Sequence, residues 1–260
     1  MQTYVIFNQK GGVGKSTVAT NLAAIAAHRG KKVLLVDLDA QANSTRYVLG
    51  KNAESEKSIA EFFSQSLRVS LYPQNLSHWI HQTPFNGLYV LPAHVTLDDL
   101  HDKLSAKHKI YKLREAFSTL DFDEIWIDTP PVMNFYTLSA FIAANACLVP
   151  FDGDRFSLDA AIQVSNHIQE VRADHNNDIR LLGAVMNGYQ VRAKAIQEGI
   201  DKLKEVMPVL EPYLPHSVVV KSSRLAEKPL VFFDASHKLT QAFESLLDSI
   251  YLNNSKFNIN

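Results

Sequence analysis

Residues 8–17 read NQKGGVGKST and directly follow a short apolar run, YVIF, at residues 4–7. The run is typical of a β-strand, and the alanine-rich sequence after the glycines is typical of a helix. The three glycines let the backbone turn its N–H groups inward and approach an anion closely. A helix that begins near Lys15 adds the positive end of its dipole. The stretch therefore predicts a loop that binds phosphate between a strand and a helix.

The end of this stretch matches the signature G-x-x-x-x-G-K-[ST] through Gly14, Lys15 and Ser16. Gln9 stands where the signature has its first glycine, and a second lysine, Lys10, lies next to it. In such a loop Lys15 would reach the β- and γ-phosphates of a nucleotide, and the Ser16 hydroxyl would ligate Mg²⁺. The purpose of the second lysine does not follow from this motif.

Outward from the loop, strand and helix patterns alternate along the chain. Residues 16–30 form an alanine-rich helix that ends at Gly30, and residues 32–39 (KVLLVDLD) form a strand covered on both faces. Further strands are expected at 87–93, 123–131, 146–151, 179–187 and 216–220, and further helices at 58–66, 109–120, 138–146, 157–172, 193–207 and 236–252. This alternation predicts an α/β fold, a doubly wound and mainly parallel sheet flanked by helices.

Length and composition limit the class of protein. The chain has 260 residues, of which 46% are hydrophobic and 20% charged, as in an ordinary globular protein with its own core. We expect a single domain over residues 1–252 and a polar tail over residues 253–260. The net charge of −1 leaves any binding of nucleic acid to a local patch. Cys147 is the only cysteine, which excludes disulfides and cysteine-based metal clusters, and no apolar run reaches the roughly 18 residues of a membrane span.

The sequence KGGVGKST at residues 10–17 resembles the deviant Walker A motif of the ParA/MinD family of P-loop ATPases. Four further segments resemble the ParA (Soj) branch in the same order along nearly the whole chain: VLLVDLDAQANST (33–45), FDEIWIDTPP (122–131), LVPFDGDRFSLDA (148–160) and RLAEKP (224–229). The resemblance implies a P-loop NTPase fold of the deviant Walker A type, with ATP and Mg²⁺ as cofactors.

The resemblance also assigns roles in nucleotide binding and catalysis. Lys10 stands where the family has a signature lysine, which reaches across a nucleotide-sandwich dimer to the phosphates of the partner, as an arginine finger does. Asn187 matches a position near the adenine. The implied nucleotide-binding residues are Lys10, Gly11, Gly12, Val13, Gly14, Lys15, Ser16, Thr17 and Asn187, and the implied catalytic residues are Lys10, Lys15 and Asp39.

Three aspartates lie at predicted strand ends. Alternation along a strand points Asp37 and Asp39 to one side, and a buried aspartate that faces a phosphate loop is costly without a cation. By resemblance, Asp37 lies near the water shell of Mg²⁺, Asp39 positions the attacking water, and Asp128 is the Walker B carboxylate that holds Mg²⁺ through water. Together with Ser16, Asp37 and Asp128 are the metal-site residues. Ala40 and Ala42 replace a proline and a glycine that the family usually has in this switch-like segment.

Residues 192–228 carry seven Lys and Arg against five Asp and Glu, a small excess that usually indicates only a solvated face. In the ParA branch, however, basic residues of this region form a nonspecific DNA-binding surface across the dimer. The implied DNA-binding residues here are Arg192, Lys221 and Arg224. The resemblance thus implies three partners: a second copy of the chain, double-stranded DNA and a ParB-like or other adaptor. It also implies a nucleoid-associated protein of the bacterial cytoplasm.

The predicted function is that of a ParA-type ATPase, which hydrolyses ATP on stimulation by an adaptor and positions a plasmid, a chromosome or a protein cargo. A MinD-like, membrane-associated division-site ATPase would need a basic amphipathic terminal helix, whereas the last helix carries Glu244 and Asp248 beside an apolar stripe and predicts core packing. We therefore expect no membrane contact. A metabolic P-loop enzyme of the dethiobiotin synthetase type stays open, while an iron protein would need paired cysteines.

Overall fold

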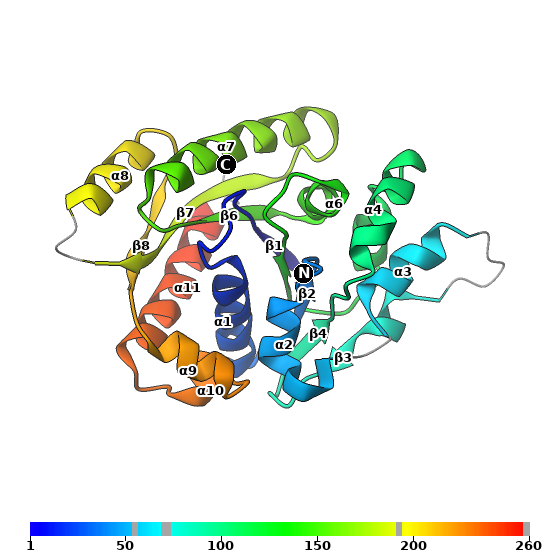
Figure 1. Ribbon diagram of the computed structural model, residues 1–260, viewed down its shortest axis with the longest axis horizontal. Coiled ribbons are helices and arrows are strands. Elements are labelled where there is room, and N and C mark those ends of the chain that lie inside the picture. The colour runs from blue at the N-terminus through cyan, green and yellow to red at the C-terminus, as the bar shows by residue number, and fades with distance from the viewer. Residues whose placement is uncertain (54–56, 69–73, 191–193, 257–260) are drawn as a thin grey trace.

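Strands and helices alternate in the computed structural model, which describes residues 1–53, 57–68, 74–190 and 194–256 (Figure 1). The strands are β1 (Gln2–Ile6), β2 (Val33–Asp37), β3 (His81–Gln82), β4 (Leu88–Leu91), β5 (Glu124–Asp128), β6 (Ala146–Phe151), β7 (Arg180–Tyr189) and β8 (Val209–Pro215). The helices are α1 (Lys15–His28), α2 (Asn43–Leu49), α3 (Ile59–Ser66), α4 (Leu97–Ala106), α5 (Lys112–Phe117), α6 (Phe135–Ala143), α7 (Arg155–Asp174), α8 (Lys194–Lys204), α9 (Val219–Leu225), α10 (Leu230–Phe233) and α11 (Lys238–Lys256), with short 3₁₀ turns at Gly50–Ala53 and Leu76–Trp79.

The strands form one sheet in the order β3-β4-β2-β5-β1-β6-β7-β8. All neighbouring pairs are parallel except β3 and β4, which are antiparallel. This confirms the predicted doubly wound, mainly parallel sheet. The chain runs outward from β1 in both directions, and in open α/β sheets ligands bind at such a switch point, beyond the carboxyl ends of the strands.

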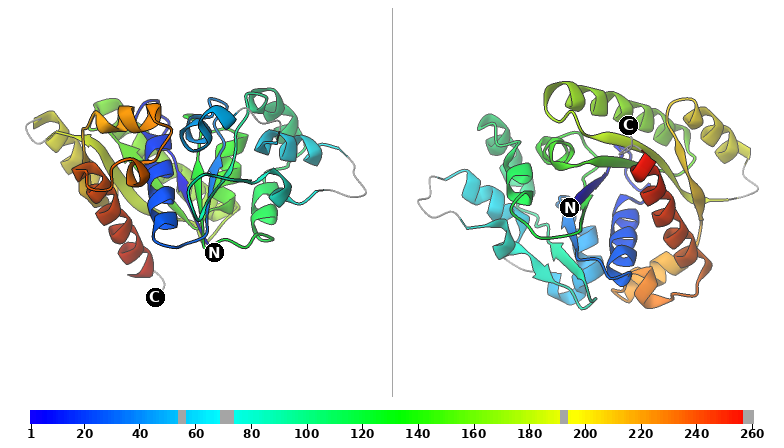
Figure 2. Two further views of the ribbon diagram at one scale, coloured as in Figure 1. Left: turned by 90° about the horizontal axis from the view of Figure 1, so that it is seen from below. Right: turned by 180° about the vertical axis from the view of Figure 1, so that it is seen from behind.

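Helices cover both faces of the sheet, as Figures 1 and 2 show. Alternate residues of β1 pack against different helical layers, as the period of two requires. Tyr4 and Ile6 belong to a buried cluster with α1, α10 and α11, whereas Val5 and the following Phe7 belong to a cluster with helices α3 to α8. The two hydrophobic layers fix the sheet between them and hold its strand ends in place.

The carboxyl ends of three central strands lie in register. Ile6 of β1 and Asp37 of β2 both pair with Asp128 of β5. The loops that follow these strands therefore leave the sheet at one edge, side by side. This edge brings the glycine-rich loop together with the aspartates at the ends of β2 and β5.

The last strand differs from the prediction. Residues 216–220 were expected to form it, but the strand is β8, and the chain after Pro215 enters α9. Two prolines in β8 argue against a central strand, yet β8 lies at the edge of the sheet, where a missing N–H donor is tolerated. The three consecutive valines favour a strand locally, and the packing of α9 overrides that preference.

The C-terminal helix also differs from the prediction, because α11 continues through Lys256 into the residues assigned to a polar tail. Asn254 is only 9% exposed, and its side-chain amide donates a hydrogen bond to the Tyr4 hydroxyl at 3.4 Å. This contact with β1 accounts for the extra turn of helix. Among the described residues, none of the helices is long and apolar enough to cross a membrane.

Cys147 lies in the middle of the core. It is a residue of β6 with no exposed surface, and burial raises the pKa of its thiol well above the usual range. The position agrees with a packing role for this side chain.

Candidate nucleotide-binding site

The glycine-rich loop joins β1 to α1 at the carboxyl edge of the sheet, as predicted. Gly12 and Gly14 have φ angles of 83° and 93°, a region that favours glycine. A Cβ atom on Gly14 would lie 2.1 Å from Nδ2 of Asn187, so a larger residue does not fit there. No side chain caps the amino end of α1, and its first N–H groups remain available to an anion.

Lys15 is the first residue of α1 and is only 7% exposed. Its ammonium donates a hydrogen bond to the carbonyl oxygen of Lys10 at 3.1 Å. Burial lowers the pKa of this ammonium, whereas the charges of Asp128 and Asp39 act in the opposite direction. A buried cation next to free backbone N–H groups is the arrangement that a polyphosphate requires.

Asp37 and Asp128 lie side by side on β2 and β5 with no exposed surface. Oδ2 of Asp37 accepts hydrogen bonds from the backbone and hydroxyl of Thr45, both at 2.8 Å, and Oδ2 of Asp128 accepts one from the Ser44 hydroxyl at 2.7 Å. Oδ1 of Asp128 is buried without a hydrogen-bond partner among the described residues. Burial raises the pKa of both carboxyl groups, and the charge of Asp128 adds to the rise at Asp37.

This donor set fits a hard divalent cation. Mg²⁺ prefers oxygen ligands and keeps several of its waters. The unpartnered Oδ1 of Asp128 offers one oxygen, and the Ser16 hydroxyl interacts with the same carboxylate. A cation would also relieve the repulsion between two buried carboxylates, so Ser16, Asp37 and Asp128 are the residues that would hold it.

Helix α2, which the sequence patterns did not predict, supports both carboxylates. Ser44 and Thr45 on its first turn bind Asp128 and Asp37, respectively. Ala42 caps this helix with φ 52°, a left-handed conformation, at the position where the resemblance expects glycine. In the sequence, only the presence of Asn43, Ser44 and Thr45 shortly after Asp39 hints at these contacts. Short hydroxyl side chains form no periodic pattern from which such contacts could be predicted.

Asp39 lies beyond the end of β2, so strand alternation does not orient it as predicted. Its Oδ1 accepts a hydrogen bond from the backbone of Gln41 at 3.0 Å, and the residue lines the same cavity as the glycine-rich loop. Unlike Asp37 and Asp128, it is partly exposed. Asp39 is therefore accessible to water on the side of the loop.

Lys10 points away from the phosphate loop of its own chain. Its ammonium forms ion pairs with Asp152 at 2.8 Å and Asp154 at 3.0 Å, both in the loop after β6. The two lysines of the motif thus occupy different surroundings, with Lys15 buried in the loop and Lys10 at its rim.

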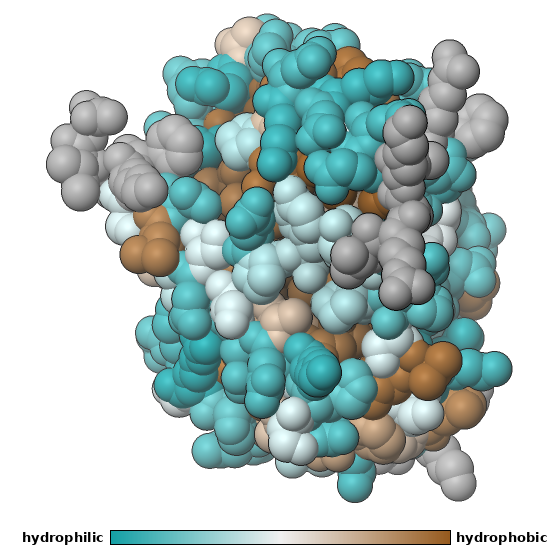
Figure 3. Space-filling view, turned by 90° about the vertical axis from the view of Figure 1, so that its left-hand side faces the viewer, coloured by the Kyte–Doolittle hydropathy of each residue, from teal (hydrophilic) through white to brown (hydrophobic). Residues whose placement is uncertain are grey.

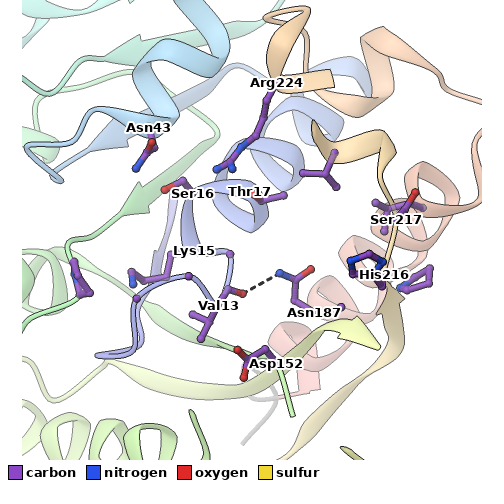
Figure 4. Close-up of a pocket in the computed structure, with 18 of the residues that line it drawn as sticks. Val13, Lys15, Ser16, Thr17, Asn43, Asp152, Asn187, His216, Ser217 and Arg224 are labelled. Carbon is purple, nitrogen blue, oxygen red and sulfur yellow. Dashed lines mark hydrogen bonds between the residues drawn. The ribbon is translucent and has the colours of Figure 1, made fainter. Parts of the chain in front are cut away.

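A cavity of about 620 Å³ opens beside the loop and is lined by Gly11 to Thr17, Asp39, Asn43, Pro131 and Asp152 (Figure 4). Asn187 of β7 lies on the opposite wall, and its side-chain amide donates a hydrogen bond to the carbonyl oxygen of Val13 at 2.9 Å. The remaining wall was not predicted from the sequence. It consists of residues from β7, the end of β8 and the turn that follows it, α9 and α11: Gly188, Pro215, His216, Ser217, Val220, Arg224 and Leu239.

Two of the three predicted DNA-binding residues, Lys221 and Arg224, lie on α9. Both are exposed, and Arg224 also lines the cavity, whereas Arg192 lies outside the described residues. Val220 and Arg224, four residues apart on α9, both face the cavity. Hydrophilic side chains cover most of the adjoining side of the molecule, where α8 and β8 lie (Figure 3).

Comparison with known proteins is consistent with this site. A family model described as an AAA domain matches residues 1–181. The chromosome-partitioning ATPase Soj of Thermus thermophilus is 34% identical over 224 residues, which cover 85% of this chain and 82% of that protein. Cobyrinic acid a,c-diamide synthase of Mycobacterium smegmatis, solved with ADP and magnesium, is 26% identical with a TM-score of 0.81 and covers 98% of this chain and 96% of its own. The McdA–ATP complex of Cyanothece shares the fold, with a TM-score of 0.84, 20% identity and 96% coverage of both chains.

Proposed function

Because this chain belongs to the ParA/MinD family of P-loop ATPases, we propose that it is a partitioning or positioning ATPase of the ParA (Soj) branch. The observation that carries the proposal is a cavity lined by Gly11 to Thr17, with Lys15 buried in its wall. Behind it, Asp128 is buried with an Oδ1 that has no hydrogen-bond partner among the described residues. ATP binds in this cavity with Mg²⁺, and its hydrolysis resets a cycle of dimer formation. The stimulation of ATP hydrolysis by an adaptor protein is inferred from the resemblance to the family.

Each group in the site has a role in this reaction. Gly11 to Thr17 bind the phosphates, and Asn187 lies on the side of the adenine. Ser16, Asp37 and Asp128 hold Mg²⁺, which neutralises the phosphate oxygens when bound. Asp39 orients the attacking water, since it is a partly exposed carboxylate beside the loop that, unlike Asp152, is not ion-paired with Lys10.

Lys10 acts on the nucleotide of a partner subunit. In the single chain its ammonium is held by Asp152 and Asp154, away from the chain's own phosphate loop. Ion pairs close to solvent contribute little to stability, so Lys10 can leave Asp152 and Asp154 at low cost. A triphosphate bound by a second copy carries more negative charge than these two carboxylates and would attract the ammonium of Lys10 more strongly. The dimer therefore depends on an intact triphosphate.

Lys10→Ala should still bind ATP, but only as a monomer. It should not form the ATP-dependent dimer, and its ATP hydrolysis should be slower than that of the natural chain. Light scattering with ATP and Mg²⁺ measures the dimer, and equilibrium dialysis measures binding. Lys32→Ala is the matched control, because Lys32 forms an exposed ion pair with Asp121 at the opposite edge of the sheet. An ATP-dependent dimer of Lys10→Ala would contradict the role across subunits.

DNA binding by the ATP dimer should ignore sequence and weaken steeply with salt. The affinity changes with salt by a slope of about −0.9 per phosphate contact, and two copies of the basic region on one duplex double the number of contacts. Lys221→Ala should weaken binding equally on unrelated sequences, since phosphate contacts carry no base information. Electrophoretic shifts with ATP, ADP and no nucleotide over a salt series test this. Equal DNA binding in all three nucleotide states would show that ATP does not control DNA binding.

One observation favours a second candidate function, an ATP-dependent enzyme of small-molecule metabolism. The likeness to the Mycobacterium smegmatis synthase covers nearly the whole chain. Turnover that rises with DNA and an adaptor, without any small-molecule substrate, would exclude this candidate.

A MinD-like function is tested by sedimentation with liposomes. We expect no sedimentation, because the apolar stripe of α11 is buried against the sheet. We place the protein on the nucleoid of the bacterial cytoplasm.

A further inference from the structure

Helix α9 presents one charged side chain to the nucleotide cavity. Arg224 lines the cavity together with Ser16 and Thr17 of α1 and Asn43 of α2. Its side chain extends from α9 into the cavity, towards the side on which Ser16 and Thr17 lie (Figure 4). Lys221, three residues earlier, does not line the cavity. Of the two cationic residues of this helix, only Arg224 lines the cavity.

The surroundings of Arg224 hold its guanidinium at this place. The Cζ atom lies 5.9 Å from the centroid of the Tyr47 ring, within the range of a cation–π contact. Tyr47 is only 2% exposed, and its hydroxyl is hydrogen-bonded to that of Ser223, the residue before Arg224. Ser223 in turn donates to the carbonyl oxygen of Lys228 at 2.6 Å. These contacts hold the end of α9 in place, and Arg224 itself stays exposed at the cavity wall.

The charge of Arg224 is not neutralised within the described part of the chain. No carboxylate there forms an ion pair with it, and Glu227, one turn further on, directs its side chain towards Gly50. Asp152 and Asp39 also line the cavity, but Asp152 pairs with Lys10, and Asp39 accepts from the backbone of Gln41. The cavity thus offers a second cation, besides Lys15, to which an anion in the cavity could bind.

We propose that Arg224 binds the polyphosphate of a nucleoside di- or triphosphate held in the cavity of its own chain. Its planar group donates several hydrogen bonds in a fixed geometry that suits phosphate oxygens. The inference rests on the proposed function only in that a nucleotide occupies this cavity. It ties α9, which also carries Lys221, to the bound nucleotide.

The test is the affinity of the full chain for Mg-ADP in the absence of DNA, measured by titration calorimetry. ADP is used because the proposed dimer requires the triphosphate. Arg224→Ala and the near-isosteric Arg224→Gln should each bind ADP about tenfold more weakly, as expected for a lost charged hydrogen bond. Both should show a shallower dependence of affinity on salt. The matched control is Lys221→Ala, which removes one charge from the same helix and should change the affinity by less than about twofold.

Unchanged affinity and salt dependence in both Arg224 variants would overturn the inference and leave the proposed function standing. An equal loss in Lys221→Ala would also overturn it, because the effect would then come from the general charge of α9. Failure of the natural chain itself to bind Mg-ADP would contradict the proposed function, and the inference with it. A purely structural role would lower the thermal unfolding temperature of the variants without changing the salt dependence of ADP binding.

Discussion

Lys15→Ala should lose measurable affinity for both ATP and ADP at concentrations that saturate the natural chain. The Lys15 ammonium is 7% exposed and lies at the start of α1, where the free N–H groups also face the cavity. Removal of one partner from a buried, charged hydrogen-bonded pair costs about 2–5 kcal/mol, or about thirtyfold to several thousandfold in affinity. Titration calorimetry with Mg-ADP and Mg-ATP measures the loss.

The Lys15 variant should still fold. In the structure its ammonium donates one hydrogen bond, to the carbonyl oxygen of Lys10, and the loop geometry depends on Gly14 and Asn187 instead. An unfolding temperature close to that of the natural chain would establish that the lost binding is local. Lys32→Ala, at the far edge of the sheet, should bind both nucleotides normally. Tight binding of ATP by Lys15→Ala would show that the glycine-rich loop is not the phosphate site.

Asp39→Ala should bind ATP and Mg²⁺ as the natural chain does and should hydrolyse ATP about a hundredfold more slowly or worse. Lys15 and Asp128 remain in place, whereas the carboxylate that orients the attacking water is removed. Single-turnover hydrolysis with excess protein measures the chemical step, and light scattering measures the dimer, which should persist with ATP.

The control for Asp39 is Asp121→Ala, which removes a fully exposed carboxylate at the opposite edge of the sheet. It should leave both the single-turnover rate and the dimer unchanged. A single-turnover rate of Asp39→Ala equal to that of the natural chain would show that another group positions the water. Loss of ATP binding would show instead that Asp39 supports the nucleotide directly.

Local sequence patterns predicted the parts of the fold that depend on local physics. Gly12 and Gly14 adopt left-handed backbone, which favours glycine, and continuous apolar runs such as 33–36 favour burial on both faces, so the loop and the central strands could be predicted. By contrast, the strand signal of the valines at 218–220 was overridden by the packing of α9, and the prolines of β8 concealed an edge strand. Both errors lie where tertiary position decides the outcome.

The site was predicted to a similar extent. Lys15, Asp37 and Asp128 were assigned from motifs, because each belongs to a short and recognisable stretch of sequence at or just after the end of a strand. The supporting hydroxyls of Ser44 and Thr45 were not, since their partners lie on other strands. The place of Arg224 in the cavity wall was not predicted either, because it depends on the connection from β8 to α9.

The burial of Cys147 has a practical consequence for experiments with this protein. As the only cysteine, it lies in β6 with no exposed surface, and burial raises the pKa of its thiol, so it should react slowly with alkylating reagents in the native state. A cysteine introduced at an exposed position such as Lys221 would then carry a fluorophore selectively, without prior removal of the natural one. Labelling of Cys147 itself would report the opening of the core, and thus the global unfolding of the chain.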